Sequence, residues 1–200
     1  MTFGNHIYAR PMMTVKIAKH FSFAPEPPWP GFRADVEKML RLVEVRFGRT
    51  HGDRTLVAVI ADGHQDCHVS EKLDIVIRVQ NWNAGDPRQA HFQVSHETLH
   101  ALSQIPEVRR TNLEEGLATV FQQDYDVCCY GSPPLQPPPN SDYELARNDV
   151  RELLNLDPNV IRKIRMVEPT ISRITAVHIR DACASCSEEL ADRLARPFDS

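Results

Sequence analysis

Apolar positions in the first part of the chain follow a helical spacing and then a strand spacing. Residues 34–47 carry apolar side chains at helical spacing, with charged residues between them, and end before Gly48, which predicts an amphipathic helix. These apolar positions are Val36, Met39, Leu40, Val43 and Phe47. Residues 14–23 are expected to be extended, and the β-branched runs at 55–61 and 73–80 predict two strands. The last run alternates apolar and polar residues, which is typical of an edge or partly exposed strand.

Helical spacing dominates the rest of the chain. It predicts a helix over residues 92–105, which Pro106 ends, and another from Thr111 or Asn112 to about residue 123. Further helices are expected over residues 142–154, 159–166, 170–182 and 187–194. The proline-rich segments 25–30 and 133–139 fit neither a helix interior nor a central strand, so both are predicted to be loops.

This order of elements predicts an α+β fold. A small N-terminal mixed sheet with helices precedes an all-helical C-terminal half. The 200 residues suit a single domain over 1–200. Within it, an N-terminal α/β lobe is expected at about 14–110 and a C-terminal helical lobe at about 111–200.

Composition narrows the expected partners and compartment. The 27 acidic and 23 basic residues give a formal net charge of −4, whereas nucleic acids and anionic membranes favour basic surfaces. The chain has no apolar run of roughly 18 residues that would span a membrane, and its first 20 residues lack the apolar core of a signal peptide. A cytoplasmic protein is therefore expected, and the sequence carries no indication of its oligomeric state.

The strongest chemical motif is His96-Glu97-Thr98-Leu99-His100, an HExxH sequence. Two histidines four positions apart lie on one face of a helix, so both imidazoles can bind one metal ion. Zinc accepts neutral imidazole nitrogen, and Glu97 can then reach the open coordination position. Apolar neighbours flank the motif, and burying two histidines and a carboxylate among them would be costly without a ligand.

A third ligand is expected downstream, because a catalytic zinc usually has three protein ligands and one open site. Residues 113–119 read Leu-Glu-Glu-Gly-Leu-Ala-Thr, which resembles the Asn-Glu-Gly-x-Ala motif of the gluzincins, the group of thermolysin-like peptidases and zinc aminopeptidases. Aligned on Gly116 and Ala118, the resemblance makes Glu115 the zinc ligand and puts Glu114 where the family often has Asn. The two glutamates lie about 100° apart on a helix, so only one of them can be the ligand.

The chain departs from the zinc peptidase families in three ways. The Gly-Ala-Met-Glu-Asn signature of the aminopeptidases is absent, so exopeptidase activity is not inferred. Ser103 and Pro106 rule out the longer metzincin motif. The thermolysin-like group orients a zinc histidine with an Asp four residues after the ligand Glu. Position 119 is Thr, so that partner must be missing or supplied by another residue.

The resemblance implies a peptidase with one zinc ion, in which Glu97 acts as general base toward the attacking water. A Tyr or His of the helical half would stabilise the oxyanion, and Tyr143 is the preferred candidate. The alternatives are Tyr125, Tyr130 and His178. The family also implies that an edge strand, taken here as residues 73–80, pairs with an extended substrate, with Asn81 and Trp82 lining the cleft.

Two other metal sets deserve comparison. His64, Cys67 and His68 have zinc-ligand chemistry, although their polar loop favours solvated histidines. Cys183 and Cys186 form a CxxC that could hold a second zinc with the adjacent pair Cys128 and Cys129. Ordinary thiols are the preferred interpretation, and the odd total of five cysteines argues against a disulfide framework.

The predicted function is therefore a zinc metallopeptidase, an endopeptidase acting on a protein or peptide. The alternatives are a catalytically inactive binding module stabilised by zinc, or a zinc hydrolase acting on another substrate class. Glu97 argues against the binding module, since a structural site needs only the ligands.

Overall fold

The computed structural model of the chain describes residues 15–49, 53–80, 86–103, 105 and 108–199. Within these ranges, four strands form one mixed sheet, and seven α-helices accompany it. The α+β class and the small mixed sheet predicted from the sequence are therefore confirmed. None of the described helices is long and apolar enough to cross a membrane.

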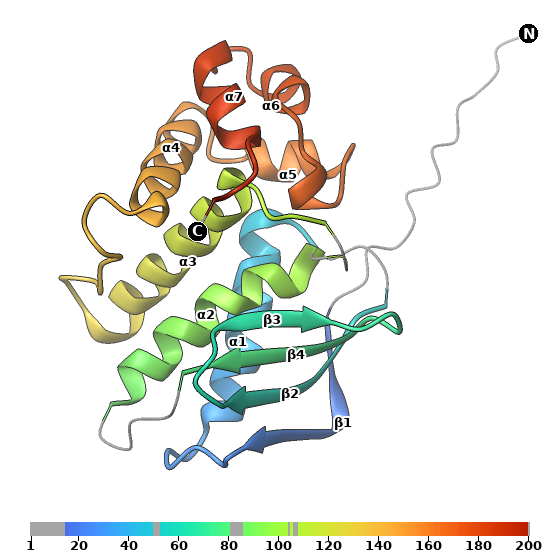
Figure 1. Cartoon of the computed structure of the whole chain (residues 1–200), viewed down its shortest axis with the longest axis vertical. Helices are drawn as coiled ribbons and strands as arrows, with labels where there is room; N and C mark the ends of the chain where they lie inside the picture. The colour runs from blue at the N-terminus through green and yellow to red at the C-terminus, as the bar shows by residue number, and fades with distance from the viewer. Residues whose placement is uncertain (1–14, 50–52, 81–85, 104, 106–107, 200) are drawn as a thin grey trace, which may run out of the picture.

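The elements follow one another along the chain as shown in Figure 1. They are β1 (Lys16–Ala24), α1 (Phe32–Phe47), β2 (Thr55–Ala61), β3 (Asp66–Val69), β4 (Asp74–Val79), α2 (Pro87–Ser103), α3 (Asn112–Tyr130), α4 (Asp142–Leu156), α5 (Val160–Arg165), the 3-10 helix η1 (Ile171–Arg173), α6 (Ala176–Ala182) and α7 (Glu188–Ala195).

The sheet has the strand order β1-β2-β4-β3. Strands β1, β2 and β4 are parallel, whereas β3 is antiparallel to β4. Helices α1 and α2 lie against one face of this sheet (Figure 1). The strand residues on that side are buried and alternate along each strand, apart from a register shift between Leu56 and Ala58. They are Leu56, Val59, Ala61, Ile75, Ile77 and Val79. The core of the N-terminal lobe therefore lies between the sheet and these two helices.

The prediction that residues 73–80 form an edge strand is wrong. Residues 73–80 form β4, which lies inside the sheet between β2 and β3. Its polar alternation has another cause: the sheet face opposite α1 and α2 leaves Asp74, Val76 and Arg78 partly exposed. The edge strands are β1 and β3. Strand β3 lies in the segment predicted to be a polar loop, and its four residues are too few to show a strand pattern in the sequence.

Helix boundaries differ from the predicted ones where capping signals outweigh apolar spacing. Helix α2 begins at Pro87 rather than at residue 92, because Asp86 accepts a hydrogen bond from the Gln89 amide and proline suits the first helical position. Helix α3 continues to Tyr130, beyond the predicted residue 123. The single helix expected over residues 170–182 is instead η1 and α6, because Thr175 starts α6 with a capping box.

Helix α3 runs through the middle of the fold and packs on both α2 and α4 (Figure 1). Gly116 permits the approach of α4. A Cβ atom at this position would lie 2.4 Å from the carbonyl oxygen of Ala146 and 2.6 Å from the Val150 side chain. The glycine of the motif is therefore needed for close helix packing.

Replacing Gly116 with alanine is expected to destabilise the protein by about 2 kcal/mol, because overpacking forces the two backbones apart. Chemical denaturation followed by circular dichroism measures this loss. Val127→Ala on the exposed side of the same helix is the control and is expected to change stability by less than about 0.5 kcal/mol. Equal stability of Gly116→Ala and wild type would show that α4 can move away at no cost.

The C-terminal helices are joined to the N-terminal lobe by a buried arginine. Arg165 donates to the carbonyl oxygens of Phe47, Gly48 and Arg49 at 2.6 to 3.1 Å, and to that of Pro169 at 3.1 Å. These bonds satisfy the end of α1. Burial lowers the pKa of Arg165 to about 10, so the side chain stays charged at neutral pH.

Replacing Arg165 with leucine should lower the free energy of unfolding by about 3 kcal/mol, because several buried carbonyls lose their donor. For a chain of this length that corresponds to a fall in Tm of roughly 10 °C. Differential scanning calorimetry provides the measurement. Arg162→Leu, at an exposed position of the same helix, should leave Tm nearly unchanged. Similar losses in both variants would argue that general charge, rather than these bonds, stabilises the junction.

Candidate metal centre

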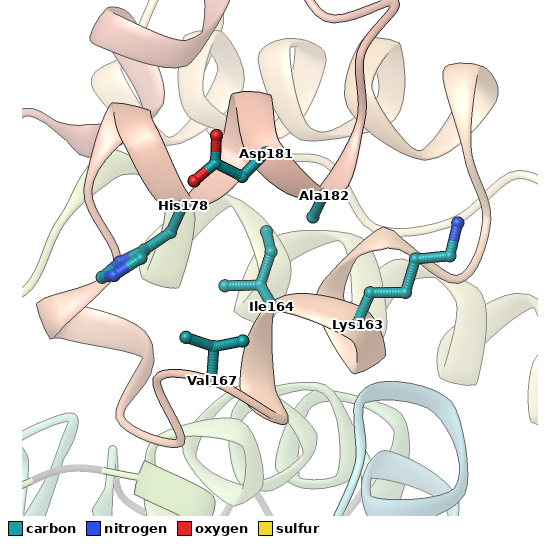
Figure 2. Close-up of a pocket in the computed structure, with 6 residues that line it drawn as sticks. All are labelled: Lys163, Ile164, Val167, His178, Asp181 and Ala182. Carbon is teal, nitrogen blue, oxygen red and sulfur yellow. The ribbon is translucent and has the colours of Figure 1, made fainter.

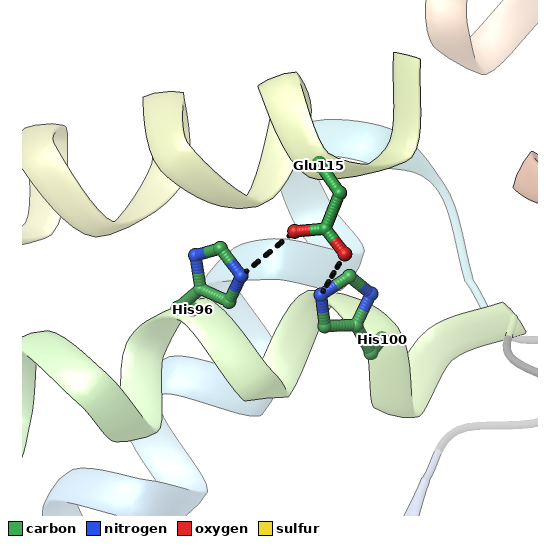
Figure 3. A group of neighbouring side chains, drawn as sticks. All are labelled: His96, His100 and Glu115. Carbon is green, nitrogen blue, oxygen red and sulfur yellow. Dashed lines mark hydrogen bonds and ion pairs between the residues drawn. The ribbon is translucent and has the colours of Figure 1, made fainter. Parts of the chain in front are cut away.

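Helices α2 and α3 bring the two histidines of the motif and Glu115 together (Figure 3). His96 and His100 lie one turn apart on α2 and point to the same side, while Glu115 reaches down from the first turn of α3. The Nε2 atom of His96 lies 3.1 Å from Oε2 of Glu115, and Nε2 of His100 lies 3.5 Å from Oε1. The helix spacing predicted from the sequence produces this convergence.

The three side chains could hold a metal ion. One ligand atom from each lies within 4.8 Å of the others, and all three residues are buried. Across the described ranges of the chain, this is the one group of His, Cys, Asp and Glu side chains close enough to share an ion. Two imidazoles and one carboxylate form a ligand set typical of catalytic zinc.

The outer nitrogen of each histidine is held by a second residue. His96 Nδ1 meets the Oε1 atom of Gln122, and His100 Nδ1 lies 2.9 Å from Oε1 of Glu114. Carboxylate and amide oxygens only accept, so both Nδ1 atoms carry the proton, and in neutral rings the Nε2 atoms carry lone pairs. Outer partners of this kind orient metal-binding histidines.

The histidine Nε2 atoms and carboxylate oxygens that face one another in the site would be stabilised by a cation between them. A lone pair of His96 Nε2 that faces a carboxylate oxygen at 3.1 Å is repelled unless a proton or a metal ion lies between them. His100 Nε2 and Glu97 Oε2 are buried, yet they make no hydrogen bond to the described residues. Burial and Arg110 favour a neutral His100, but Glu115 and Glu114 outweigh them and raise its pKa to about 9. The residues present therefore fit a divalent metal.

Glu97 and Glu115 share a basic neighbour. Arg110 Nη1 donates to Oε1 of Glu115 at 3.0 Å, and its Nη2 lies 4.0 Å from Oε2 of Glu97. Burial opposes the charge on Arg110, but Glu115, Glu97 and Glu114 raise its pKa further above the usual high value. Burial likewise opposes the charge on Glu115, yet the histidine rings hold its pKa well below the ordinary range. Both groups are therefore ionised at neutral pH.

The C-terminal segment holds the loop that carries Arg110. The Phe198 amide donates to the Arg110 carbonyl, and the amide of Asn112 donates to the Arg196 carbonyl, both at 2.9 Å. Thr111 caps α3 by accepting from the Glu114 amide. The start of the Glu115 helix is therefore fixed from two sides.

A cleft of about 250 Å³ opens beside the candidate metal-binding group of His96, His100 and Glu115. His96, Glu97, Arg110 and Tyr143 line one part of it, and residues 136–138 of the second proline-rich loop form another wall. Arg88 fixes that loop, since it donates to both Asp126 carboxylate oxygens at 2.7 Å and to the Pro133 carbonyl. The loop predicted to lie at the surface is thus part of the site.

Tyr143 is the one of the four oxyanion candidates that lines the cleft. Its ring centroid lies 6.0 Å from that of His96, and it packs on Phe198 at 4.8 Å. Burial, Glu115 and Glu97 raise the pKa of Tyr143, so the phenol keeps its proton and can donate a hydrogen bond. Tyr125 and Tyr130 instead contact His91. Tyr143 therefore stays the candidate.

His178 belongs to a different part of the fold. It lines a pocket of about 300 Å³ between α5 and α6, beside Lys163, Ile164 and Asp181 (Figure 2). Its Nδ1 accepts from the Thr175 amide as part of the capping box of α6. This histidine is thus accounted for by local structure.

The rival zinc sets are not assembled. Cys67 is buried and His68 exposed, as neighbours on a strand must be, and His64 contacts Asp62 at the surface. Burial, followed by the nearby Glu97, raises the pKa of the Cys67 thiol well above its usual value, which disfavours a thiolate ligand. Cys183 and Cys186 are buried free thiols, whereas Cys128 and Cys129 are exposed.

The contacts of three further side chains at the candidate site were not predicted from the sequence. Glu114 supplies the outer partner expected from position 119, where Thr119 bonds instead to the Glu115 carbonyl at 2.8 Å. Gln122 and Arg110 carry no motif of their own, although Gln122 lies seven residues after Glu115 and hence on the same helix face. Asn81 and Trp82, the predicted substrate-binding residues, lie outside the described residues.

Comparisons with known proteins yield no relative. No family model matches the chain, and neither the curated proteins nor the solved structures include a similar one. Whatever is inferred about function therefore rests on the residues of the site.

Proposed function

We propose that the chain is a zinc-dependent endopeptidase that hydrolyses a peptide bond of a protein or peptide substrate. One observation carries this proposal: the buried His96, His100 and Glu115 group lies beside the Glu97 carboxylate at the wall of an open cleft. A purely structural metal site needs no such carboxylate and no access from solvent. A zincin-like relationship is part of the same proposal.

Zinc suits the ligand set better than magnesium or calcium does. Magnesium and calcium prefer oxygen ligands, whereas two imidazoles with one carboxylate are typical of catalytic zinc. When bound, zinc supplies a Lewis acid that acidifies water and polarises a carbonyl. His96, His100 and Glu115 would hold it, with Gln122 and Glu114 fixing the two rings.

The chain's own residues would then carry the proton transfers. Glu97 takes the proton of the attacking water and later delivers it to the leaving nitrogen. Its Oε2 atom makes no hydrogen bond to the described residues, which leaves it available for this role. The Tyr143 phenol donates a hydrogen bond to the developing oxyanion.

The corrected sheet order also favours a peptide substrate. Strand β3 is antiparallel to β4 and has an open edge among the described strands. Gln65, directly before β3, lines the cleft. An extended peptide could therefore add to β3 by main-chain hydrogen bonds while its scissile bond approaches Glu97.

Casein cleavage tests the proposal. The zinc-loaded chain is expected to generate new N-termini, identified by mass spectrometry, and removal of zinc with a chelator should stop the reaction until zinc is restored. A chain that binds zinc but cleaves no protein or peptide would contradict the peptidase role. Ester or nucleoside hydrolysis in that case would favour a zinc hydrolase of another substrate class.

A further inference from the structure

The cleft next to the metal-binding group has walls rich in side-chain amides. Among the described residues that line it, six are glutamines: Gln65, Gln80, Gln89, Gln93, Gln122 and Gln136. Apolar side chains contribute less, since Phe92, Pro137 and Pro138 are the aliphatic or phenylalanine side chains among the described residues of that lining. A wall of this kind matches polar, uncharged groups rather than an apolar side chain.

Four of these glutamines are held by the protein. Gln93 accepts from the Gln80 amide at 2.9 Å and donates to the Gln80 side chain at 3.3 Å. Gln122 holds His96, and Gln136 is bonded to Gln123 and to the Pro134 carbonyl. These side chains form a fixed frame.

Gln65 and Gln89 differ from this frame. Both are exposed, and neither side chain has a hydrogen bond to another described residue. Each keeps an amide N–H pair and a carbonyl oxygen for a bound molecule. The remaining charges of the cleft face one another, because Arg110 lies against Glu115 and Glu97. The charged side chains described in the cleft therefore neutralise one another and do not favour a charged group on the substrate.

The position of Gln89 sets a distance from the reacting bond. Gln89, Gln93 and His96 follow at i, i+4 and i+7 on one face of α2, so the cleft runs along this helix. Seven residues correspond to about 10 Å of helix, which is roughly the length of three residues of an extended peptide.

We propose that the cleft selects a substrate with an uncharged polar side chain, bearing an amide or hydroxyl, about three residues from the cleaved bond, and that Gln89, together with Gln65, recognises it. This inference rests on the proposed peptidase function, whose site it extends. Each new hydrogen bond from an exposed amide contributes modestly, so two of them amount to about a tenfold preference over an apolar side chain of similar size.

Peptidyl hydroxamates test the inference without requiring turnover. The probes are alanine peptides that extend to either side of the zinc-binding group and carry glutamine or leucine at the first, second or third residue. Binding to the zinc-loaded full chain is measured by calorimetry. Glutamine is expected to bind about tenfold tighter than leucine at the third residue on one side, with smaller differences nearer the metal.

The variants Gln89→Leu and Gln65→Leu, combined, should remove this preference while leaving zinc content unchanged. Asn155→Leu removes an exposed side-chain amide on α4 and is the control. This variant should keep the preference for glutamine probes. The inference would be overturned if leucine probes bound as tightly as glutamine probes, or if none of the probes bound. It would also be overturned if the double variant kept the preference for glutamine. A polar preference without any peptide cleavage would reject the peptidase proposal alone.

Discussion

Glu97→Gln is expected to lower the rate of peptide cleavage by roughly 10²- to 10⁴-fold, the usual contribution of a general base. Glutamine has the shape of glutamate but cannot accept the proton of the attacking water. The Nη2 atom of Arg110 lies 4.0 Å from Oε2 of Glu97, so the substitution breaks no short ion pair. Initial rates on a fluorogenic peptide provide the measurement.

This variant must keep its metal for the result to be informative. Zinc content by elemental analysis should equal that of wild type, because the ligands His96, His100 and Glu115 are untouched. Glu71→Gln makes the same chemical change at an exposed position and should cleave at the wild-type rate. A zinc-loaded Glu97→Gln protein with full activity would refute the assignment of Glu97 as the base.

Glu115→Ala is expected to reduce zinc affinity by more than the roughly 10- to 100-fold that loss of an orienting partner costs. The change removes one of three ligands and leaves Arg110 without its 3.0 Å carboxylate partner. Competition with a chromophoric chelator gives the affinity, and wild type should retain one zinc per chain.

Glu114→Gln tests which of the two adjacent glutamates is the zinc ligand. Glu114 lies 2.9 Å from the outer nitrogen of His100 rather than at the inner atoms of the site, so its loss should weaken zinc binding by only about 10- to 100-fold. The reverse ranking, with Glu114→Gln losing more zinc than Glu115→Ala, would make Glu114 the ligand. If both variants kept full zinc affinity, neither carboxylate would belong to the zinc site.

Local spacing predicted that His96, His100 and Glu115 lie together, because the geometry of this candidate metal site is mostly helical. His96 and His100 need only one turn of helix to converge, and Glu115 was chosen over Glu114 by a short motif. The choice depended on a resemblance, since either glutamate can start a helix. The contact of Glu114 with His100 exists only when α3 packs across α2, which no local pattern encodes.

The sheet was predicted less well because its order is set by distant contacts. Strand β4 has the alternation of an edge strand but pairs with β2 on one side and β3 on the other. Strand β3 has four residues, one of them an exposed histidine, and becomes a strand by pairing with Ile75 to Arg78. The cleft walls show the same limit: residues 136–138 are held at the site by bonds of their loop to Arg88 of α2 and to Gln123 and Asp126 of α3, which are distant in the sequence.

The anchoring of this loop has a consequence for how the proposed peptidase could cut a protein substrate. The wall formed by residues 136–138 cannot swing away without breaking the bonds that hold its loop. Arg88 donates to the Pro133 carbonyl at 2.7 Å, the Leu135 amide donates to Asp126 at 2.8 Å, and Gln123 donates to Gln136 at 3.0 Å. A cleft of about 250 Å³ is far smaller than a folded domain, so a protein substrate of the proposed peptidase would enter it as an extended segment. A folded target must then expose its cleavage site by local unfolding before it binds. The rate of its cleavage would follow the opening equilibrium of the target, so the chain, as the proposed peptidase, would respond to the conformational stability of its substrates.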